Sequence, residues 1–367
     1  CSERVVALNR LVEDADIVLD TYRVWPLALL RQGKLAEAMK VAQEGRQLAQ
    51  LDGDPIKEGY ILNSMGLIAI EQKDPAIAHG YLEQALSIAR ETGNRRLESM
   101  TLGNLGNSAG YVRQDYASAR EYYEKDFALS HERGERSSEA VSLGNLGWVA
   151  GMQGDLQAAR SYQERALLLS REVGNLYLEI YMLINLSAVT GIANKPQPSL
   201  EYAQNALKLA RITGDRSGEA WSLLYGGYAR LLFNDLQQAE QSFRASIAIR
   251  DELGQPSMRV ESLAGLIQTL LRKGDRDAAM GETENIISYL QTGHTLEGTE
   301  EPLRVYYACY LALEEAQDPR LHTILDLAVQ LLEAQVSKLP DEPSRRMYVE
   351  NVPWRLAIQQ AWYKRSD

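Results

Sequence analysis

The feature that most constrains this 367-residue chain is a repeated unit of about forty residues. Each copy contains an apolar segment, a short polar turn, a second apolar segment and a joint in which a polar residue follows glycine. The joints follow one another in steps of 40, 41, 40, 40 and 40 residues. Their glycines are Gly53, Gly93, Gly134, Gly174, Gly214 and Gly254. Because such a unit cannot bury its apolar face alone, the repeat predicts a stack of units that share one continuous core.

The turn inside each unit recurs with the same spacing as the joints. Two independent sequence features therefore share one period. The turn residues are Lys34, Asp74, Asp115, Asp155, Lys195, Asp235 and Asp275. Glycine supplies the left-handed conformation that ends a helix, and aspartate is a preferred helix N-cap. Asp54 followed by Pro55 is a clear helix start of this kind. The spacing therefore predicts two helices in every unit.

The residues between these turns and joints resemble the tetratricopeptide repeat. The clearest copy, residues 137–174, matches its leucine, Gly-Asp and spaced-alanine pattern at Leu143, Leu146, Gly147, Gly154, Asp155, Ala159 and Ala166. The period exceeds the standard 34 residues. The long copies are similar to the repeats in sensor domains of bacterial signal-transduction NTPase regulators, of the maltose-regulon activator type. The resemblance implies an all-α, right-handed superhelical solenoid of about eight helix pairs with terminal capping helices.

The chain is expected to divide into four segments. Residues 1–15 read either as the end of an earlier repeat or as an N-terminal capping helix, and residues 16–295 form the repeat array. Residues 296–339 form an irregular last helix pair, and residues 340–367 form a C-terminal capping helix. Pro353 is expected to bend or split that last helix, because proline removes a backbone hydrogen bond.

Composition excludes several classes of protein. The net charge of −11 disfavours direct binding to nucleic acid, because an acidic chain gains nothing from counterion release around phosphate. Cys1 and Cys309 are the only cysteines, which fits a reducing compartment. No apolar run is long enough to cross a bilayer and no signal peptide is visible. These features predict a cytoplasmic protein without membrane contact.

The sequence offers no constellation for catalysis, metal or cofactor. The histidines His79, His131, His294 and His322 stand in different repeats, without the close pairing of a metal site. No nucleotide-binding loop of the G-x-x-x-x-G-K-[ST] type occurs. The glycines from Gly103 to Gly106 fall inside an expected helix and indicate packing rather than a dinucleotide loop. We therefore expect a non-enzymatic protein with no cofactor.

The resemblance implies where a partner would bind, because the first helix of each pair lines the concave wall of a tetratricopeptide array. At the wall positions large aromatic residues and asparagines surround glycines such as Gly144 and Gly191. Glycines at the base of a groove, with aromatic side chains beside them, would allow a peptide or an apolar ligand to approach the helices closely. The candidate groove residues are Tyr60, Asn63, Asn104, Tyr111, Asn145, Trp148, Tyr181, Asn185, Trp221 and Tyr228.

Each of these features has a structural alternative. The glycines could instead allow neighbouring first helices to pack closely. The column of Asn104, Asn145 and Asn185 could form a hydrogen-bond ladder between repeats rather than contacts with a bound peptide backbone. Sequence alone leaves both alternatives open.

The leading functional hypothesis is a recognition module, the sensor or scaffold part of a larger bacterial signalling or regulatory protein. Its partners would be a protein or peptide segment, or a small effector, together with a fused or associated signalling domain. The alternative is a self-association scaffold that uses the convex face and the C-terminal helix carrying Trp354 and Trp362.

Overall fold

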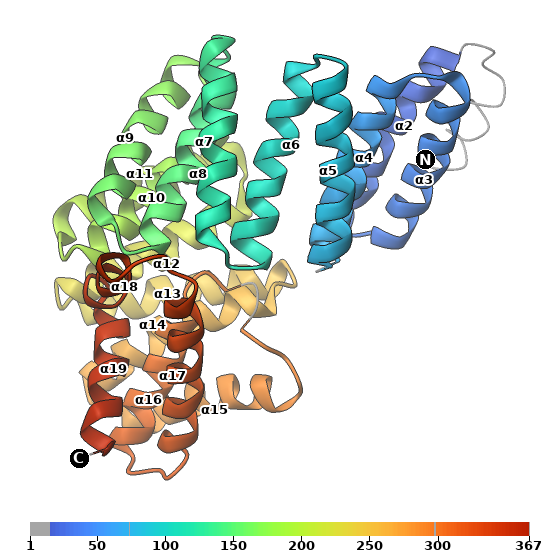
Figure 1. Cartoon of the computed structure of the whole chain (residues 1–367). Helices are drawn as coiled ribbons and strands as arrows, with labels where there is room; N and C mark the ends of the chain where they lie inside the picture. The colour runs from blue at the N-terminus through green and yellow to red at the C-terminus, as the bar shows by residue number, and fades with distance from the viewer. Residues whose placement is uncertain (1–14, 73, 297–298, 367) are drawn as a thin grey trace. The chain divides into compact units, whose positions relative to one another are not determined.

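The computed structural model describes residues 15–72, 74–296 and 299–366. Their secondary structure is helical: consecutive α-helices form pairs joined by short turns, as the repeat predicts (Figure 1). The helices fall into two compact units, one ending at Glu135 and the other beginning at Arg136. The segment 1–15 expected to end an earlier repeat lies, as far as residue 14, outside the described residues.

The described part of the first unit contains three helix pairs, the third of which is lengthened by a π-helical segment. Its elements are α2 (Ala15–Arg31), α3 (Leu35–Asp52), α4 (Pro55–Glu71), α5 (Pro75–Glu91), α6 (Arg95–Asn107), η1 (Ser108–Val112) and α7 (Tyr116–Glu132). Alanines of the second helices and larger side chains of the first helices form its core; Ala38, Ala78, Ile61 and Leu62 are fully buried. Pro26 lies inside α2 without ending it.

The second unit continues the pairs and then departs from them. Its regular part comprises α8 (Arg136–Met152), α9 (Leu156–Glu172), α10 (Leu176–Ile192), α11 (Pro196–Thr213), α12 (Arg216–Leu232), α13 (Leu236–Glu252), α14 (Pro256–Lys273) and α15 (Arg276–Gln291). Its last part comprises α16 (Pro302–Glu315), α17 (Leu321–Ser337), α18 (Glu342–Glu350) and α19 (Pro353–Ser366). The predicted last helix is split immediately before Pro353.

The predicted turn and joint residues determine where the helices begin and end. The Asp155 side chain accepts a hydrogen bond from the Ala158 N–H at 3.0 Å and so caps α9. Gly174 then adopts φ = 67° at the joint, a conformation that costs glycine little. The turn residue is a capping aspartate in five of the seven turns and a lysine without a side-chain cap bond at Lys34 and Lys195, but the common spacing of joints and turns was sufficient to locate the helices.

The single 41-residue step has a structural counterpart. It separates Gly93 from Gly134, and the same interval contains η1, the only π-helical segment in the described ranges. There the Arg113 N–H donates to the Ser108 carbonyl, one residue further back than in an α-helix. π-Bulges widen a helix by one residue at such sites. The extra residue of this repeat is therefore accommodated in the π-helical segment η1 rather than in a loop.

A glutamate recurs in the first turn of five first helices, and four of these carboxylates pair with an arginine of the preceding helix. Glu179 accepts from Arg171 Nε at 2.7 Å, and Glu219 accepts from Arg211 Nε at 2.9 Å. Both arginines stand in the last turn of the preceding helix. The column comprises Glu58, Glu98, Glu139, Glu179 and Glu219. These carboxylates also lie where the helix dipole favours negative charge.

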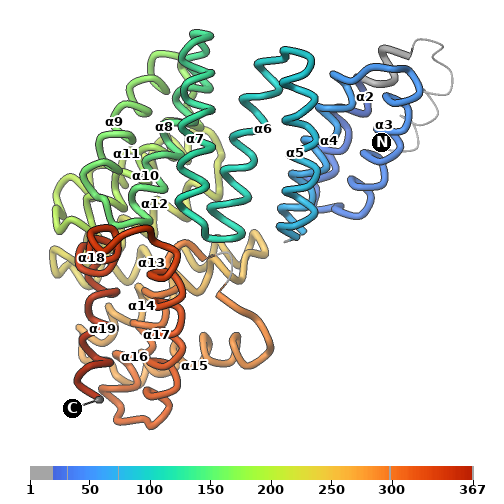
Figure 2. The backbone as a smooth tube through the Cα atoms, viewed as in Figure 1, coloured from blue at the N-terminus to red at the C-terminus, as the bar shows by residue number. Residues whose placement is uncertain are grey.

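The C-terminal segment of the second unit folds back onto the end of α8 (Figure 2). The Asn351 side-chain amide donates to the Gly154 carbonyl at 2.9 Å, and Arg355 Nη1 donates to the Met152 carbonyl at 2.9 Å. These contacts join residues about two hundred positions apart in the sequence. The start of α19 is thereby held against the end of α8.

Trp354 and Trp362 have different surroundings on α19. Trp354 is buried at 8% exposure and packs in a core cluster with Leu303, Leu325 and Tyr348. It is therefore not available to the self-association face that the sequence suggested, whereas Trp362 is half-buried.

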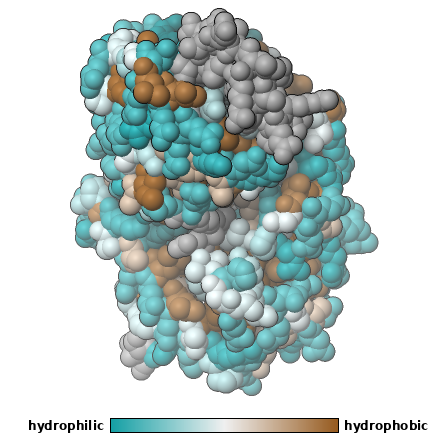
Figure 3. Space-filling model, turned by 90° about the vertical axis from the view of Figure 1, so that its right-hand side faces the viewer, coloured by the Kyte–Doolittle hydropathy of each residue, from teal (hydrophilic) through white to brown (hydrophobic). Residues whose placement is uncertain are grey.

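Apolar side chains on the face seen in Figure 3 occur in small separate groups among hydrophilic residues. None of the helices in the described part of the chain is both long and apolar enough to span a membrane.

Candidate functional site

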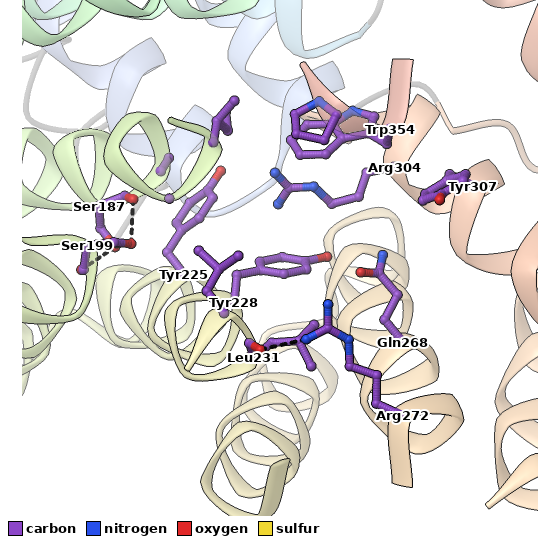
Figure 4. Close-up of a pocket in the computed structure, with 15 residues that line it drawn as sticks. Ser187, Ser199, Tyr225, Tyr228, Leu231, Gln268, Arg272, Arg304, Tyr307 and Trp354 are labelled. Carbon is purple, nitrogen blue, oxygen red and sulfur yellow. Dashed lines mark hydrogen bonds between the residues drawn. The ribbon is translucent and has the colours of Figure 1, made fainter. Parts of the chain in front are cut away.

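A cavity of about 210 Å³ lies in the second unit, where the first helices meet the folded-back C-terminal segment (Figure 4). Its lining residues come from α10, α11, α12, α14, α16 and α19. The wall is mostly apolar and aromatic, and includes Ile192, Leu231, Tyr307, Pro353 and Trp354. None of the described lining residues is acidic.

Arg304 is the central polar group of this cavity. Its guanidinium lies between two aromatic rings, with its carbon 3.6 Å from the Trp354 ring centroid and 4.2 Å from that of Tyr228 (Figure 4). Such cation–π contacts stabilise a desolvated cation. Arg304 is only 8% exposed, and its Nε has no hydrogen-bond partner among the described residues. The two rings fix the guanidinium in place and leave its edge directed into the cavity.

Further polar groups stand around Arg304. Arg272 Nη1 donates to the Leu231 carbonyl at 2.8 Å, which holds this second guanidinium at the mouth. Gln268, one turn earlier on α14, also lines the opening. Burial raises the pKa of Tyr228 to about 12, although the charge of Arg304 lowers it, so its hydroxyl stays protonated and donates to the Glu261 carbonyl at 3.3 Å. The cavity therefore presents cationic and neutral polar groups on an apolar wall.

A buried acidic cluster lies behind Arg304. The Glu261 carboxylate accepts from the backbone N–H groups of Glu300 and Glu301, and the Tyr225 hydroxyl donates to Glu300 at 2.8 Å. Burial, reinforced by the charge of Glu300, raises the pKa of Glu261 to about 8. Burial likewise raises the pKa of Glu300. Low-dielectric surroundings thus favour the neutral form of Glu261 at pH 7.

Glu301 connects this cluster to α19. One of its carboxylate oxygens accepts from Arg355 Nη2 at 3.0 Å, and the other accepts from the Trp354 indole N–H at 3.1 Å. Arg355 is 1% exposed, so this is a buried and directional ion pair. Removing either partner would leave an uncompensated buried charge. The pair therefore fixes Trp354 and the start of α19 as one wall of the cavity.

A smaller cavity of about 40 Å³ adjoins the first and shares Ala188, Ile192, Tyr225 and Arg304 with it. Trp148 and Asn185, both predicted groove residues, line this smaller space, and Glu300 and Glu301 lie on its other side. Tyr228 is the predicted residue that lines the main cavity. The structure therefore gathers Trp148, Asn185 and Tyr228 around one region.

Other predicted groove residues of the second unit lie elsewhere. Trp221 is 7% exposed and carries the guanidinium of Arg250 4.5 Å above its ring, so it belongs to the core. Tyr181 is 36% exposed at the surface of α10, and Asn145 is half-buried on α8. None of these three lines either cavity.

The predicted residues of the first unit show packing roles. Asn104 Nδ2 donates to Asn63 Oδ1 at 2.9 Å, which is a hydrogen bond between repeats, but Asn63 lies outside the predicted column of Asn104, Asn145 and Asn185. The Tyr60 ring faces the Arg23 guanidinium at 5.5 Å. Tyr111 is half-exposed on η1.

The glycines at the predicted concave wall have two different roles, both of which the sequence left open. Some allow close helix packing, and others line a cavity. A Cβ on Gly144 would lie 2.7 Å from Met182 Cε, so this glycine allows the close packing of α8 and α10. Gly191 lines the main cavity, and a Cβ there would meet only Ser199 Oγ at 3.1 Å. Gly151 lines the smaller cavity. Packing and cavity formation thus use different glycines.

Sequence reasoning missed the residues that define the cavity's chemistry. Arg304 and Trp354 lie after the regular repeats, and Arg272 and Gln268 lie on the first helix of the seventh pair, which the groove prediction did not include. The wall positions of the repeats therefore could not identify them. The aromatic and arginine residues clustered in the last helix were the available signal.

Comparisons with known proteins agree with this fold. Residues 96–172 match the family model described as Tetratricopeptide repeat. No curated protein matches the chain closely enough to define a relative. Similar solved structures nevertheless cover most of the chain at low sequence identity, so they define the fold and leave the activity open. The molecule is thus an all-α array of tetratricopeptide-like helix pairs.

Three solved proteins illustrate the similarity. The apo quorum sensor NprR from B. thuringiensis is 13% identical with a TM-score of 0.65, covering 90% of this chain and 92% of NprR. A Rap protein complexed with Competence and Sporulation Factor is 14% identical with a TM-score of 0.60, covering 96% and 99%. A signal transduction ATPase with a tetratricopeptide repeat sensor, from Pyrococcus horikoshii, is 15% identical with a TM-score of 0.59. That match covers 88% of this chain and 45% of the ATPase.

Proposed function

We propose that the chain is a non-enzymatic recognition module that binds a peptide segment or a small effector, with the cavity of the second unit as its ligand site. In this proposal it is the sensor or scaffold part of a larger bacterial signalling or regulatory protein. The observation that carries the proposal is the cavity beside Arg304. A largely apolar pocket with a few convergent polar groups is the usual form of a ligand site.

The position of the cavity supplies a means of signalling. A ligand in it would touch the array through α12 and α14, and the C-terminal segment through α16 and α19. Binding would therefore stabilise one arrangement of these helices over others, by the difference in its affinity for them. An associated domain that senses α19 would then respond to the ligand.

Proteins of similar fold support this class of function. NprR has been solved in complex with its cognate peptide NprX, and the Pyrococcus protein carries its repeats as a sensor. The identities of 13–15% transfer no ligand from those proteins to this chain.

The test fills the cavity and measures binding. Leu232 lines the mouth at 39% exposure, whereas Leu253 has the same exposure at the end of α13, outside the cavity lining. Peptides and small metabolites that bind the wild-type chain, detected by calorimetry, should lose affinity about ten-fold or more in Leu232→Trp. They should bind Leu253→Trp normally. Equal affinity for both variants would contradict the assignment of the site.

The proposed sensor role can be tested separately by sequencing the gene's full reading frame. We expect the reading frame that contains these residues to encode an NTPase, cyclase or DNA-binding segment as well. A reading frame without such a segment would contradict the sensor role but not the ligand site.

A further inference from the structure

We propose that the cavity binds a small monocarboxylate with an apolar body, whose carboxylate pairs with Arg304. This inference rests on the proposed function, because it names the ligand class of the same site. It commits to a free small molecule rather than to a peptide.

The first argument is that Arg304 is a buried cation that interacts electrostatically with Glu261 and Glu300 but forms no ion pair with a described residue. This side chain is 8% exposed, and none of the ion pairs of the described residues includes it. It also stands in the first turn of α16, where the helix dipole disfavours a cation and favours an anion. A bound carboxylate would pair with the guanidinium and also lie near the positive end of α16.

The neighbouring acids do not fill this role. Glu301 is already bonded to Arg355 and to the Trp354 indole, and Glu261 is bonded to two backbone N–H groups. Glu300 accepts from the Tyr225 hydroxyl. All three lie outside the lining of the main cavity. Glu261 and Glu300 interact with Arg304 electrostatically, but no described acid forms an ion pair with it, so an external anion can reach Arg304 from the main cavity.

The second argument is the chemistry of the rest of the cavity. Ile192, Leu231 and Pro353 supply an apolar wall, and Tyr307 supplies an aromatic one. An inorganic anion such as phosphate would leave this wall without contacts and would itself lose hydration. A ligand with a carboxylate at one end and a hydrocarbon body satisfies both parts of the cavity.

The third argument is size and closure. An engineered cavity of about 150 Å³ holds benzene, so a cavity of about 210 Å³ fits a ligand of about ten non-hydrogen atoms. An extended peptide following the first helices would meet α19, which Arg355 holds against the Met152 carbonyl and Glu301. Volume and closure together favour a small molecule.

The experiment titrates the full chain with phenylacetate, phenylacetamide and inorganic phosphate, using calorimetry. Wild type should bind phenylacetate roughly ten- to hundred-fold more tightly than the amide, the range of a charged hydrogen bond. Phosphate should bind more weakly than phenylacetate. Equal binding of the acid and the amide, or no binding of any of the three, would overturn the inference. This comparison needs no variant and so does not depend on the folding of a mutant.

Arg304→Met tests the named residue. It should lose the preference for phenylacetate over phenylacetamide, while Arg276→Met, which removes an exposed surface charge, should keep it. A preference retained in Arg304→Met, with its fold checked by circular dichroism, would overturn the role of Arg304.

The proposed function can fail separately. A peptide whose binding is abolished by Leu232→Trp but unchanged by Arg304→Met would uphold the ligand site and overturn the carboxylate inference. Binding of phenylacetate that survives Leu232→Trp would overturn both, because the probe would then occupy another place.

Discussion

At the scale of single residues, the second unit is organised around arginines that are buried beside aromatic rings. Arg304 lies between Tyr228 and Trp354, and Arg250 lies over Trp221. A ring face offsets part of the desolvation of a guanidinium but provides no hydrogen-bond acceptor. Arg250 donates to the Ser217 hydroxyl and to the Gln255 side chain, whereas Arg304 Nε has no hydrogen-bond partner among the described residues. This is the property that makes Arg304 suited to ligand contact rather than to structure alone.

Glu261 gives a pH prediction at the same scale. Burial raises its pKa from 4.5 to about 8. Between these values the unfolded chain loses this proton while the folded chain keeps it. The free energy of unfolding should therefore fall as pH rises from about 4.5 to 8 and level off above. Glu261→Gln keeps an acceptor oxygen for the backbone N–H groups and should flatten this fall in urea unfolding.

The control for this prediction is Glu240→Gln. Its carboxylate accepts from Lys273, and this hydrogen bond lowers its pKa, so its contribution to stability has the opposite sign. The fall in unfolding free energy with pH should persist in this variant. A wild-type stability that does not fall over this range would contradict the burial of a protonated Glu261.

At the scale of helices, the recurring caps give each repeat its boundaries. Asp155 caps α9 through the Ala158 N–H, whereas Lys195 stands at the equivalent position of α11 without a side-chain cap bond. Asp155→Ala should lower the free energy of unfolding by about 1 kcal/mol, and Lys195→Ala should change it by less than about 0.5 kcal/mol. Urea unfolding of both variants measures the difference. Equal losses would show that the cap bond does not set the helix end.

The helices were predictable because their signals are local. A glycine that must adopt positive φ and an aspartate that caps the next helix depend only on their neighbours in sequence, as at Gly174 and Asp155. The 41-residue step was visible too, but the sequence did not indicate that η1 would absorb it. An inserted residue can enter a loop or a helix, and tertiary packing decides between them.

At the scale of the whole molecule, the candidate site depends on contacts that the repeat pattern does not encode. The pattern predicted Tyr228, Trp148 and Asn185 around the site, because these occupy equivalent wall positions of regular repeats. It did not predict that α19 would return to the end of α8 through Asn351 and Arg355. That return buries Trp354 and forms the second wall. These long-range contacts do not recur from repeat to repeat, so the repeat pattern could not predict them.

The most direct test of the central claim is hydrogen exchange of the full chain with and without phenylacetate, followed by mass spectrometry. We predict slower exchange in α10, α12, α14, α16 and α19, which line the cavity, and unchanged exchange in the pairs α2–α3 and α4–α5, which do not. Protection confined to the first unit, or no protection anywhere at a concentration that calorimetry shows to be saturating, would contradict it.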